Sequence, residues 1–155
     1  MVAEATKSAA IYDPRSFKSR DAVGALMAFA RKAIADEYGR ELEPVGLSVQ
    51  QALVIILVGE HRAGTAADMC RRLSYDAGAM TRLVDKLESM ELVRRVRESH
   101  DRRSARLELT RQGKSLYAQV IRVQVEVLNR MLRGFSKNEV QTLERFLKRI
   151  LENAA

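Results

Sequence analysis

The residues of this chain best suited to chemistry are arginines concentrated in one short stretch. From Arg94 to Arg111 the sequence holds seven arginines against three acidic residues, and it has no lysine there. The planar guanidinium group suits phosphate oxygens and a narrow DNA minor groove. The stretch therefore indicates contact with a nucleic acid.

A helix predicted over residues 76–90 comes directly before these arginines. Its apolar residues recur at three- and four-residue steps and form one stripe, made of Met80, Leu83, Val84, Leu87 and Met90. The opposite face collects Gly78, Thr81, Arg82, Asp85 and Ser89, with Lys86 at its border. Because the start of this face is small, the helix backbone can approach a DNA groove. The alternative is an ordinary amphipathic helix whose Arg82 and Lys86 are merely solvated.

Two short runs with strand character follow, at residues 92–97 and 104–109. Their apolar residues include Val93, Val96, Leu107 and Leu109. A polar segment at 98–103 lies between them. This pattern predicts a β-hairpin with a long, basic tip.

Four segments of the sequence closely resemble the MarR family of winged helix-turn-helix regulators: residues 83–88, 92–95, 101–104 and 109–114. The resemblance extends from about Phe17 to the C-terminus. Its most specific part is the Asp-Arg-Arg wing tip followed by Leu-Thr-x-x-Gly. One position departs from the family pattern, because Glu91 stands where the family usually has glycine. Either Glu91 accepts a left-handed conformation that glycine adopts at little cost, or the helix ends differently.

The resemblance implies a mainly α fold with a small β-hairpin wing. A mobile tail is expected over residues 1–14, and a single MarR-like unit over residues 15–155. Within that unit, residues 47–110 are expected to form a winged helix-turn-helix head. Residues 15–43 and 111–155 are expected to be the N- and C-terminal dimerisation helices.

Capping residues and chain breaks place the remaining helices. A first helix is predicted over residues 17–42, ended by Glu43-Pro44-Val45-Gly46. Ser48 with Gln51 begins a second, although its apolar run at 53–58 leaves a buried strand as the alternative. Thr65 with Asp68 begins a third, at helix-turn-helix spacing from the helix that starts at Asp76.

Two apolar stripes share the helix predicted over residues 113–133: Leu116, Val120, Val123, Val127 and Met131, and beside them Ile121, Val125, Leu128 and Leu132. One stripe can pack on the chain's own domain. The second indicates a partner, most simply another copy of the chain. Gly134 ends this helix, and Ser136 with Glu139 begins the last one.

Composition agrees with a DNA-binding protein. The net charge of +7 favours a polyanionic partner, and the aromatic content of 5% without tryptophan argues against binders that stack single-stranded bases. A single cysteine excludes an intramolecular disulfide framework. Since no apolar run approaches the length of a membrane span and no signal core is present, we expect a cytoplasmic protein without membrane contact.

Catalytic patterns are absent from the sequence. It has no P-loop, dinucleotide fingerprint, nucleophile elbow or zinc-type grouping, so we expect no enzyme activity, cofactor or metal. His61 is either a functional group or a histidine at a helix end. Cys70 is either a redox switch or a small core residue.

The resemblance also implies roles in DNA binding. The helix from Asp76 would enter a major groove, Arg103 would insert into the minor groove with Asp101 holding its guanidinium, and Arg102 would bind phosphate. On the open helix face, Thr81 and Arg82 are the predicted contacts to base edges. The full predicted set is Gly78, Thr81, Arg82, Lys86, Arg97, His100, Asp101, Arg102 and Arg103.

The sequence thus predicts a homodimeric, sequence-specific transcriptional regulator of duplex DNA, most often a repressor in this family. Its operator should be a near-palindrome with half-sites about 10 to 10.5 base pairs apart. An architectural DNA protein without sequence preference is the alternative.

Members of this family commonly bind small, often aromatic and anionic compounds, and the resemblance places such a site between the dimerisation helices and the head. The residues predicted to line it are Phe17, Ser19, Arg20, Ile56, Leu57 and His61. Arg20 can pair with a carboxylate in bidentate fashion, or it is simply solvated.

Overall fold

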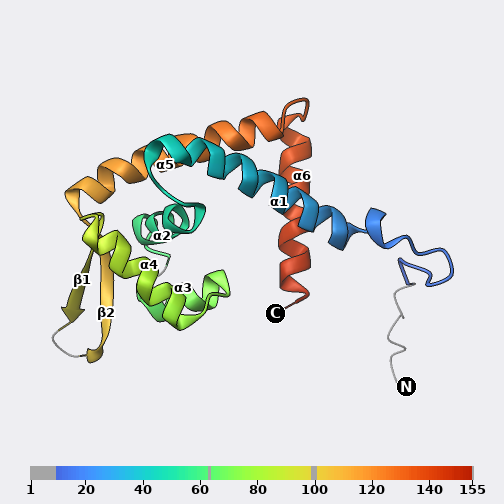
Figure 1. The fold of residues 1–155 in the computed structure, drawn as a ribbon. Coiled ribbons are helices and arrows are strands. Elements are labelled where there is room, and N and C mark those ends of the chain that lie inside the picture. Colours follow the sequence, from blue (N-terminus) through green and yellow to red (C-terminus); the bar gives the residue numbers. More distant parts are fainter. Residues whose placement is uncertain (1–9, 63, 99–100, 155) are drawn as a thin grey trace, which may run out of the picture. The chain divides into compact units, whose positions relative to one another are not determined.

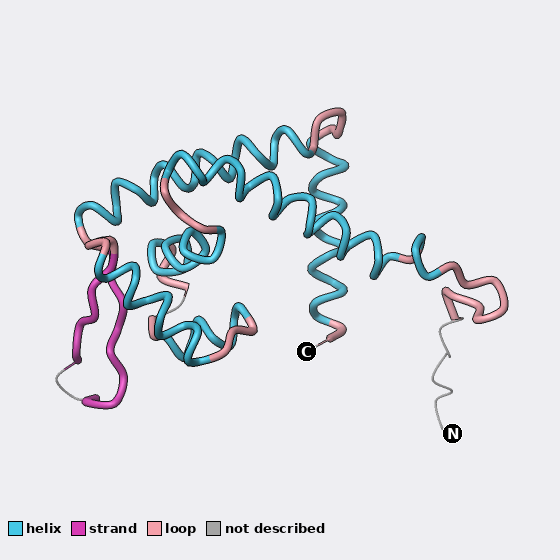
Figure 2. Tube along the Cα trace, viewed as in Figure 1, coloured by secondary structure: helices cyan, strands magenta, loops and turns pink. Residues whose placement is uncertain are grey.

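The computed structural model describes residues 10–62, 64–98 and 101–154, with the backbone alone described at 97–98 and 101–104. The elements in chain order are η1 (Ser19–Asp21), α1 (Val23–Leu42), η2 (Glu43–Val45), α2 (Val49–Gly59), α3 (Ala66–Leu73), α4 (Ala77–Ser89), β1 (Val93–Glu98), β2 (Asp101–Leu109), α5 (Arg111–Met131) and α6 (Lys137–Glu152). Helices dominate, and β1 and β2 form one antiparallel hairpin (Figure 1, Figure 2). The predicted fold class is confirmed.

The chain divides into two compact units, Met1–Ala33 and Ile34–Ala155. In the first unit, α1 begins at Val23, so the predicted start near Phe17 is wrong. The chain is extended at Ala22, which interrupts the helical conformation between η1 and α1. The Tyr12 hydroxyl then accepts a hydrogen bond from the Val23 N–H at 3.1 Å, satisfying one of the amides that a helix start leaves unpaired.

The second unit is built around α2. The Ser48 side chain accepts a hydrogen bond from the Gln51 N–H, and the Gln51 side chain accepts one from the Ser48 N–H. This capping box starts a helix, and the alternative of a buried strand at 53–58 is wrong.

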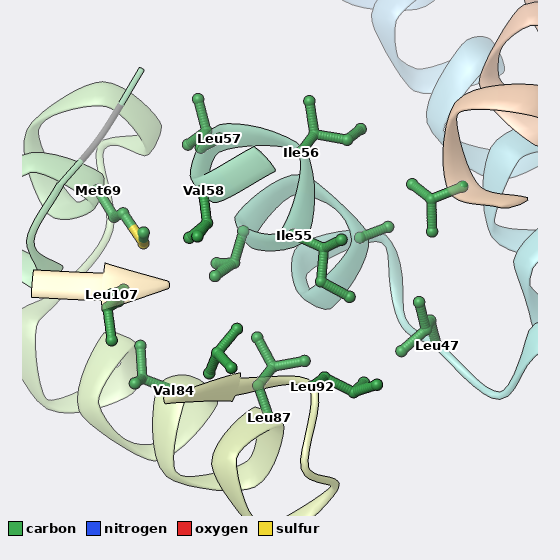
Figure 3. Close-up of a cluster of buried hydrophobic side chains, with 14 of the residues drawn as sticks. Leu47, Ile55, Ile56, Leu57, Val58, Met69, Val84, Leu87, Leu92 and Leu107 are labelled. Carbon is green, nitrogen blue, oxygen red and sulfur yellow. The ribbon is translucent and has the colours of Figure 1, made fainter. Parts of the chain in front are cut away.

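Side chains from the surrounding elements pack against α2 and make the core of this unit. Besides α2 itself, the buried contributors include Met69, Met80, Val84, Leu87, Leu92, Val93, Leu107, Val120 and Val127. Figure 3 shows side chains of α3, α4 and β2 converging on α2. Each large buried side chain stabilises the fold by about 1.5 to 3 kcal/mol. The core therefore ties α2, α3, α4, α5 and the hairpin together within the second unit.

The helix-turn-helix has the predicted spacing. Thr65 caps α3 as predicted, and with Asp68 it forms a capping box. The hydrogen bond from the Thr65 side chain is the main cause that lowers the pKa of Asp68. Ser74 adopts a left-handed conformation at φ 50° and turns the chain into α4. Cys70 is partly buried and packs against the core, as expected of a small core residue.

The hairpin differs from the prediction at its tip. Strand β1 continues to Glu98 and β2 starts at Asp101, so the predicted six-residue loop at 98–103 is wrong. The pairing runs in register from Val93 opposite Leu109 to Arg97 opposite Ala105, and after a shift in register Glu98 lies opposite Asp101. At the other edge, the Leu107 N–H donates to the Gly64 carbonyl at 2.8 Å, which joins β2 to the segment before α3.

The last two helices carry apolar residues that the unit itself does not cover. Val120 and Val127 of α5 are buried, whereas Val125 is exposed. No residue of α6 is buried, although its exposed residues include Leu143, Phe146, Ile150 and Leu151. Among the described residues, no single helix is long and apolar enough to cross a membrane, and one bent pair, 23–45 with 49–59, passes that test of length and composition.

Candidate nucleic-acid interface

The open face of α4 is the predicted recognition surface. Gly78, Thr81, Arg82 and Lys86 are exposed on it, while Met80, Val84 and Leu87 on the opposite side are buried in the core. The Thr81 hydroxyl donates to the Ala77 carbonyl at 2.9 Å, which leaves its oxygen able to accept a hydrogen bond from a base edge. The core thus holds α4 by one side and presents the other outward.

The start of α4 can approach a second backbone closely. The Asp76 carboxylate accepts a hydrogen bond from the Ala79 N–H at 2.9 Å and so caps the helix. Gly78 lies beside this cap, where a Cβ atom would stand 3.2 Å from the Asp76 carboxylate oxygen. Glycine therefore keeps both the cap and the adjacent surface uncrowded.

Arg82 and Lys86 supply positive charge to this face. In the part of the chain that the structure describes, neither residue forms an ion pair. Their charged groups therefore need not break an internal contact before they bind a base edge or a phosphate oxygen.

The wing root is the segment 90–92, which connects α4 to β1. Glu91 adopts the left-handed conformation at φ 57°, so the first of the two alternatives at this position is correct. The Thr110 hydroxyl donates to the Glu91 carbonyl at 2.5 Å and accepts from the Gly113 N–H at 3.0 Å. A Cβ atom on Gly113 would lie 1.9 Å from the Leu92 carbonyl oxygen. The Leu-Thr-x-x-Gly motif therefore joins the start of α5 to the wing root.

Two of the wing arginines, Arg94 and Arg95, form ion pairs with acidic residues of the chain itself. Arg94 pairs with Glu108 on the neighbouring strand at 2.8 Å, and that hydrogen bond is the main cause that lowers the pKa of Glu108. Arg95 pairs with Asp85 and Glu88 of α4. These two arginines are paired with acidic residues of the chain itself, so the count of seven arginines overstated the charge available to DNA.

The predicted tip residues are located less fully. Arg97 lies in β1, and Asp101, Arg102 and Arg103 lie in β2, each with its backbone alone described. His100 lies outside the described residues. Their roles in DNA binding stay predictions.

The predicted ligand residues have different environments. Phe17, Ser19 and Arg20 are exposed in the first unit, with Ser19 and Arg20 in η1 rather than in α1, and the Arg20 guanidinium lies 3.6 Å from the Asp21 carboxylate. In the second unit Ile56 and Leu57 are buried in the core, and His61 is exposed at φ 55° after the end of α2. The ligand site stays a prediction.

The sequence reasoning missed the contact of Arg95 with α4. A signal was available, because Arg95 is two residues from the buried Val93 and so shares its face of the strand. The described residues include no group of three or more His, Cys, Asp or Glu side chains placed to hold a metal ion.

Comparisons with known proteins agree with this geometry. A family model of the MarR family matches residues 45–104, from the segment before α2 into the wing. SarZ of Staphylococcus aureus strain MRSA252, an HTH-type transcriptional regulator, is 27% identical over 127 residues, which are 79% of this chain and 84% of SarZ.

Solved structures are similar over most of the chain. The transcriptional regulator PA3341 is 32% identical with a TM-score of 0.77, and the match covers 84% of this chain and 96% of that one. A mutant of MarR from E. coli complexed with operator DNA is 26% identical with a TM-score of 0.73, over 83% of this chain and 92% of that one. The family-model match, the identity with SarZ and PA3341 and the similarity to these solved structures thus identify the chain as a member of the MarR family, a winged-helix transcriptional regulator that binds DNA.

Proposed function

We propose that the chain is a homodimeric, sequence-specific repressor that binds a near-palindromic operator in duplex DNA and leaves it when a small ligand binds. The observation that carries the proposal is the open face of α4, where Gly78, Thr81 and Arg82 are exposed beside an arginine-rich wing. A major groove admits one α-helix and presents a distinct pattern of donors and acceptors for each base pair.

The base edges are assigned to Thr81 and Arg82. Arginine binds guanine through two parallel hydrogen bonds, and each such pair discriminates against a wrong base by about 1 to 3 kcal/mol. Lys86, one turn further along α4, suits a phosphate oxygen. The wing would place Arg103 in the flanking minor groove, with Asp101 orienting its guanidinium.

An architectural DNA protein without sequence preference is the competing function. Competition binding separates the two, with a labelled fragment of the gene's own promoter displaced by unlabelled promoter or by unrelated DNA. The proposed regulator should prefer its promoter by about a thousandfold or more. Equal displacement by both competitors would support the architectural function instead.

The dimer is supported by the apolar residues of α6. A helix with no buried residue and with Leu143, Phe146 and Ile150 exposed leaves apolar surface in water within a single chain. A second copy covers such a surface most simply, and it also gives the two-fold symmetry of a palindromic operator. Sedimentation of the wild type and of Phe146→Glu tests this, since the variant should shift from dimer to monomer.

The ligand part of the proposal concerns Arg20, which is exposed and has only the Asp21 carboxylate near it at 3.6 Å among the described ion pairs. An ion pair this exposed contributes little to stability, so a ligand carboxylate can replace the Asp21 carboxylate at little cost. Calorimetry with a panel of benzoate-like acids on the wild type and Arg20→Ala tests the assignment, with operator release as a second readout. If an acid binds and releases DNA equally well in both proteins, Arg20 is not its anchor.

The proposal places the protein in the cytoplasm, where a bacterial-type regulator meets its DNA, and assigns it no enzyme activity. A single partly buried cysteine is compatible with a reducing compartment.

A further inference from the structure

Arg95 lies on the inner face of the wing. The hairpin pairs Val93 with Leu109 and Arg95 with Leu107, and residues two apart on a strand share a face. Val93 and Leu107 on that face are buried in the core. Arg95 therefore projects toward α4, whereas its neighbour Arg94 projects outward and pairs with Glu108.

Two carboxylates of α4 meet the Arg95 side chain. Its Nη2 atom lies 2.6 Å from Oδ1 of Asp85, and its Nη1 atom donates to Glu88. Glu88 also accepts a hydrogen bond from the Arg95 backbone N–H at 3.1 Å. The hydrogen bond to Asp85 is the main cause that raises the pKa of Arg95. Arg95 is therefore bound to α4 through both its side chain and its backbone.

This contact is directional in a way that the apolar core is not. Apolar burial depends mainly on area, so Val93 and Leu107 define the angle of the wing less sharply than a directed ion pair does. The planar guanidinium with its two carboxylates allows only a narrow range of angles. Since only residues 90–92 connect α4 to β1, the contact closes a short loop between the two elements.

Asp85 also lies beside the residues assigned to base edges. It follows Arg82 by three positions and Thr81 by four, so it shares their side of α4. The carboxylate that holds the wing thus belongs to the same helical turn that faces the bases.

We propose that Arg95, Asp85 and Glu88 form a clamp that sets the angle between α4 and the wing, so that base reading and minor-groove insertion occur together. This role rests on the proposed sequence-specific function. The three are positioning residues, and none of them needs to touch DNA.

The net charge of the clamp means that breaking it should affect binding to the operator and binding to unrelated DNA differently. Arg95 carries one positive charge and the two acids carry two negative charges, so the clamp has a net charge of about −1 at neutral pH. Removing an acidic charge near DNA raises affinity for any sequence through electrostatics. Releasing the wing lowers affinity for the operator alone, because only the operator requires both contacts in register.

The test first defines an operator as the duplex that the full-length wild type enriches from a random pool. Kd values for that operator and for unrelated duplex DNA are then measured for Asp85→Asn. The ratio of the two affinities should fall about tenfold or more, which is the scale of one lost base contact. Affinity for unrelated DNA should stay level or rise.

Glu108→Gln is the matched control. It removes the same charge and also breaks an arginine ion pair, Arg94 with Glu108 at 2.8 Å, but that pair lies within the hairpin. Its affinities for operator and unrelated DNA should change together and leave their ratio unaltered. Thermal unfolding of each variant checks that the fold is kept.

Arg95→Lys keeps the charge but reaches only one of the two carboxylates, so it should fold and show an intermediate ratio. This variant decides the matter if Asp85→Asn does not fold. An unchanged ratio in the folded clamp variants, or equal losses for both DNAs, would overturn the clamp alone. Failure of the wild type to enrich any sequence would overturn the proposed function and the clamp with it.

Discussion

Replacing Glu91 with glycine should stabilise the protein. Glu91 sits at φ 57°, where a residue with a Cβ atom pays about 1 to 2 kcal/mol that glycine does not. Glycine loses about 0.4 to 1 kcal/mol more than other residues by its freedom in the unfolded chain. The difference predicts a net gain of about 0.5 to 1 kcal/mol. For a chain of this size that gain raises Tm by about 1 to 4 °C.

The assay is thermal unfolding of wild type, Glu91→Gly and Glu91→Ala at one fixed protein concentration, because the Tm of an oligomer depends on concentration. Alanine removes the carboxylate but keeps the Cβ atom, so it separates the backbone effect from the loss of charge. We expect glycine to be more stable than alanine and wild type. A glycine variant no more stable than the alanine variant would refute the reasoning from backbone conformation.

Three further predictions use other parts of the chain. Arg103→Ala should weaken operator binding and lower the salt slope of log K by about one unit, with unfolding unchanged; equal affinity in a titration at fixed salt would contradict this. Gly113→Ala places a Cβ atom 1.9 Å from the Leu92 carbonyl oxygen and should lower the free energy of unfolding, measured by chemical denaturation, by about 3 kcal/mol or more. Gly39→Ala is the control, because its Cβ atom meets only the Val49 side chain at 3.5 Å, and it should be neutral or mildly stabilising. Burial raises the pKa of Tyr38 to about 12, and its hydroxyl has no hydrogen-bond partner among the described residues. Because the folded pKa lies above the unfolded value of about 10, the wild type loses stability as pH rises from about 10 to 12. Across that window the free energy of unfolding of Tyr38→Phe, measured by chemical denaturation, should fall by about 1 to 3 kcal/mol less than that of the wild type.

Local signals explain which helix starts could be predicted. Ser48, Thr65, Asp76 and Ser136 each cap the helix expected from the sequence, because a cap bonds to an amide only three residues ahead. The start of α1 was predicted too early, since the amide of Val23 is satisfied by Tyr12, eleven residues away. A distant partner of that kind leaves no periodic pattern in the sequence.

The hairpin shows the same limit. Its existence followed from Val93, Val96, Leu107 and Leu109, the apolar residues of two short runs that flank a polar segment. The strand ends did not, because pairing across the hairpin carries charged residues into β-structure despite their weak preference for it. Arg95 was counted as a DNA-facing charge for a related reason. Its partners Asp85 and Glu88 are neighbours only after α4 packs on the wing.

The central claim is that α4 reads bases in a duplex operator, and selection from a random duplex pool with wild type and Arg82→Ala tests it most directly. The wild type should enrich a near-palindrome with half-sites about 10 to 10.5 base pairs apart. Arg82→Ala should lose its preference at one symmetric pair of positions, equivalent to about 1 to 3 kcal/mol each, and keep the others. A wild-type protein that enriches no sequence, or an Arg82→Ala pool identical to that of the wild type, would contradict the claim.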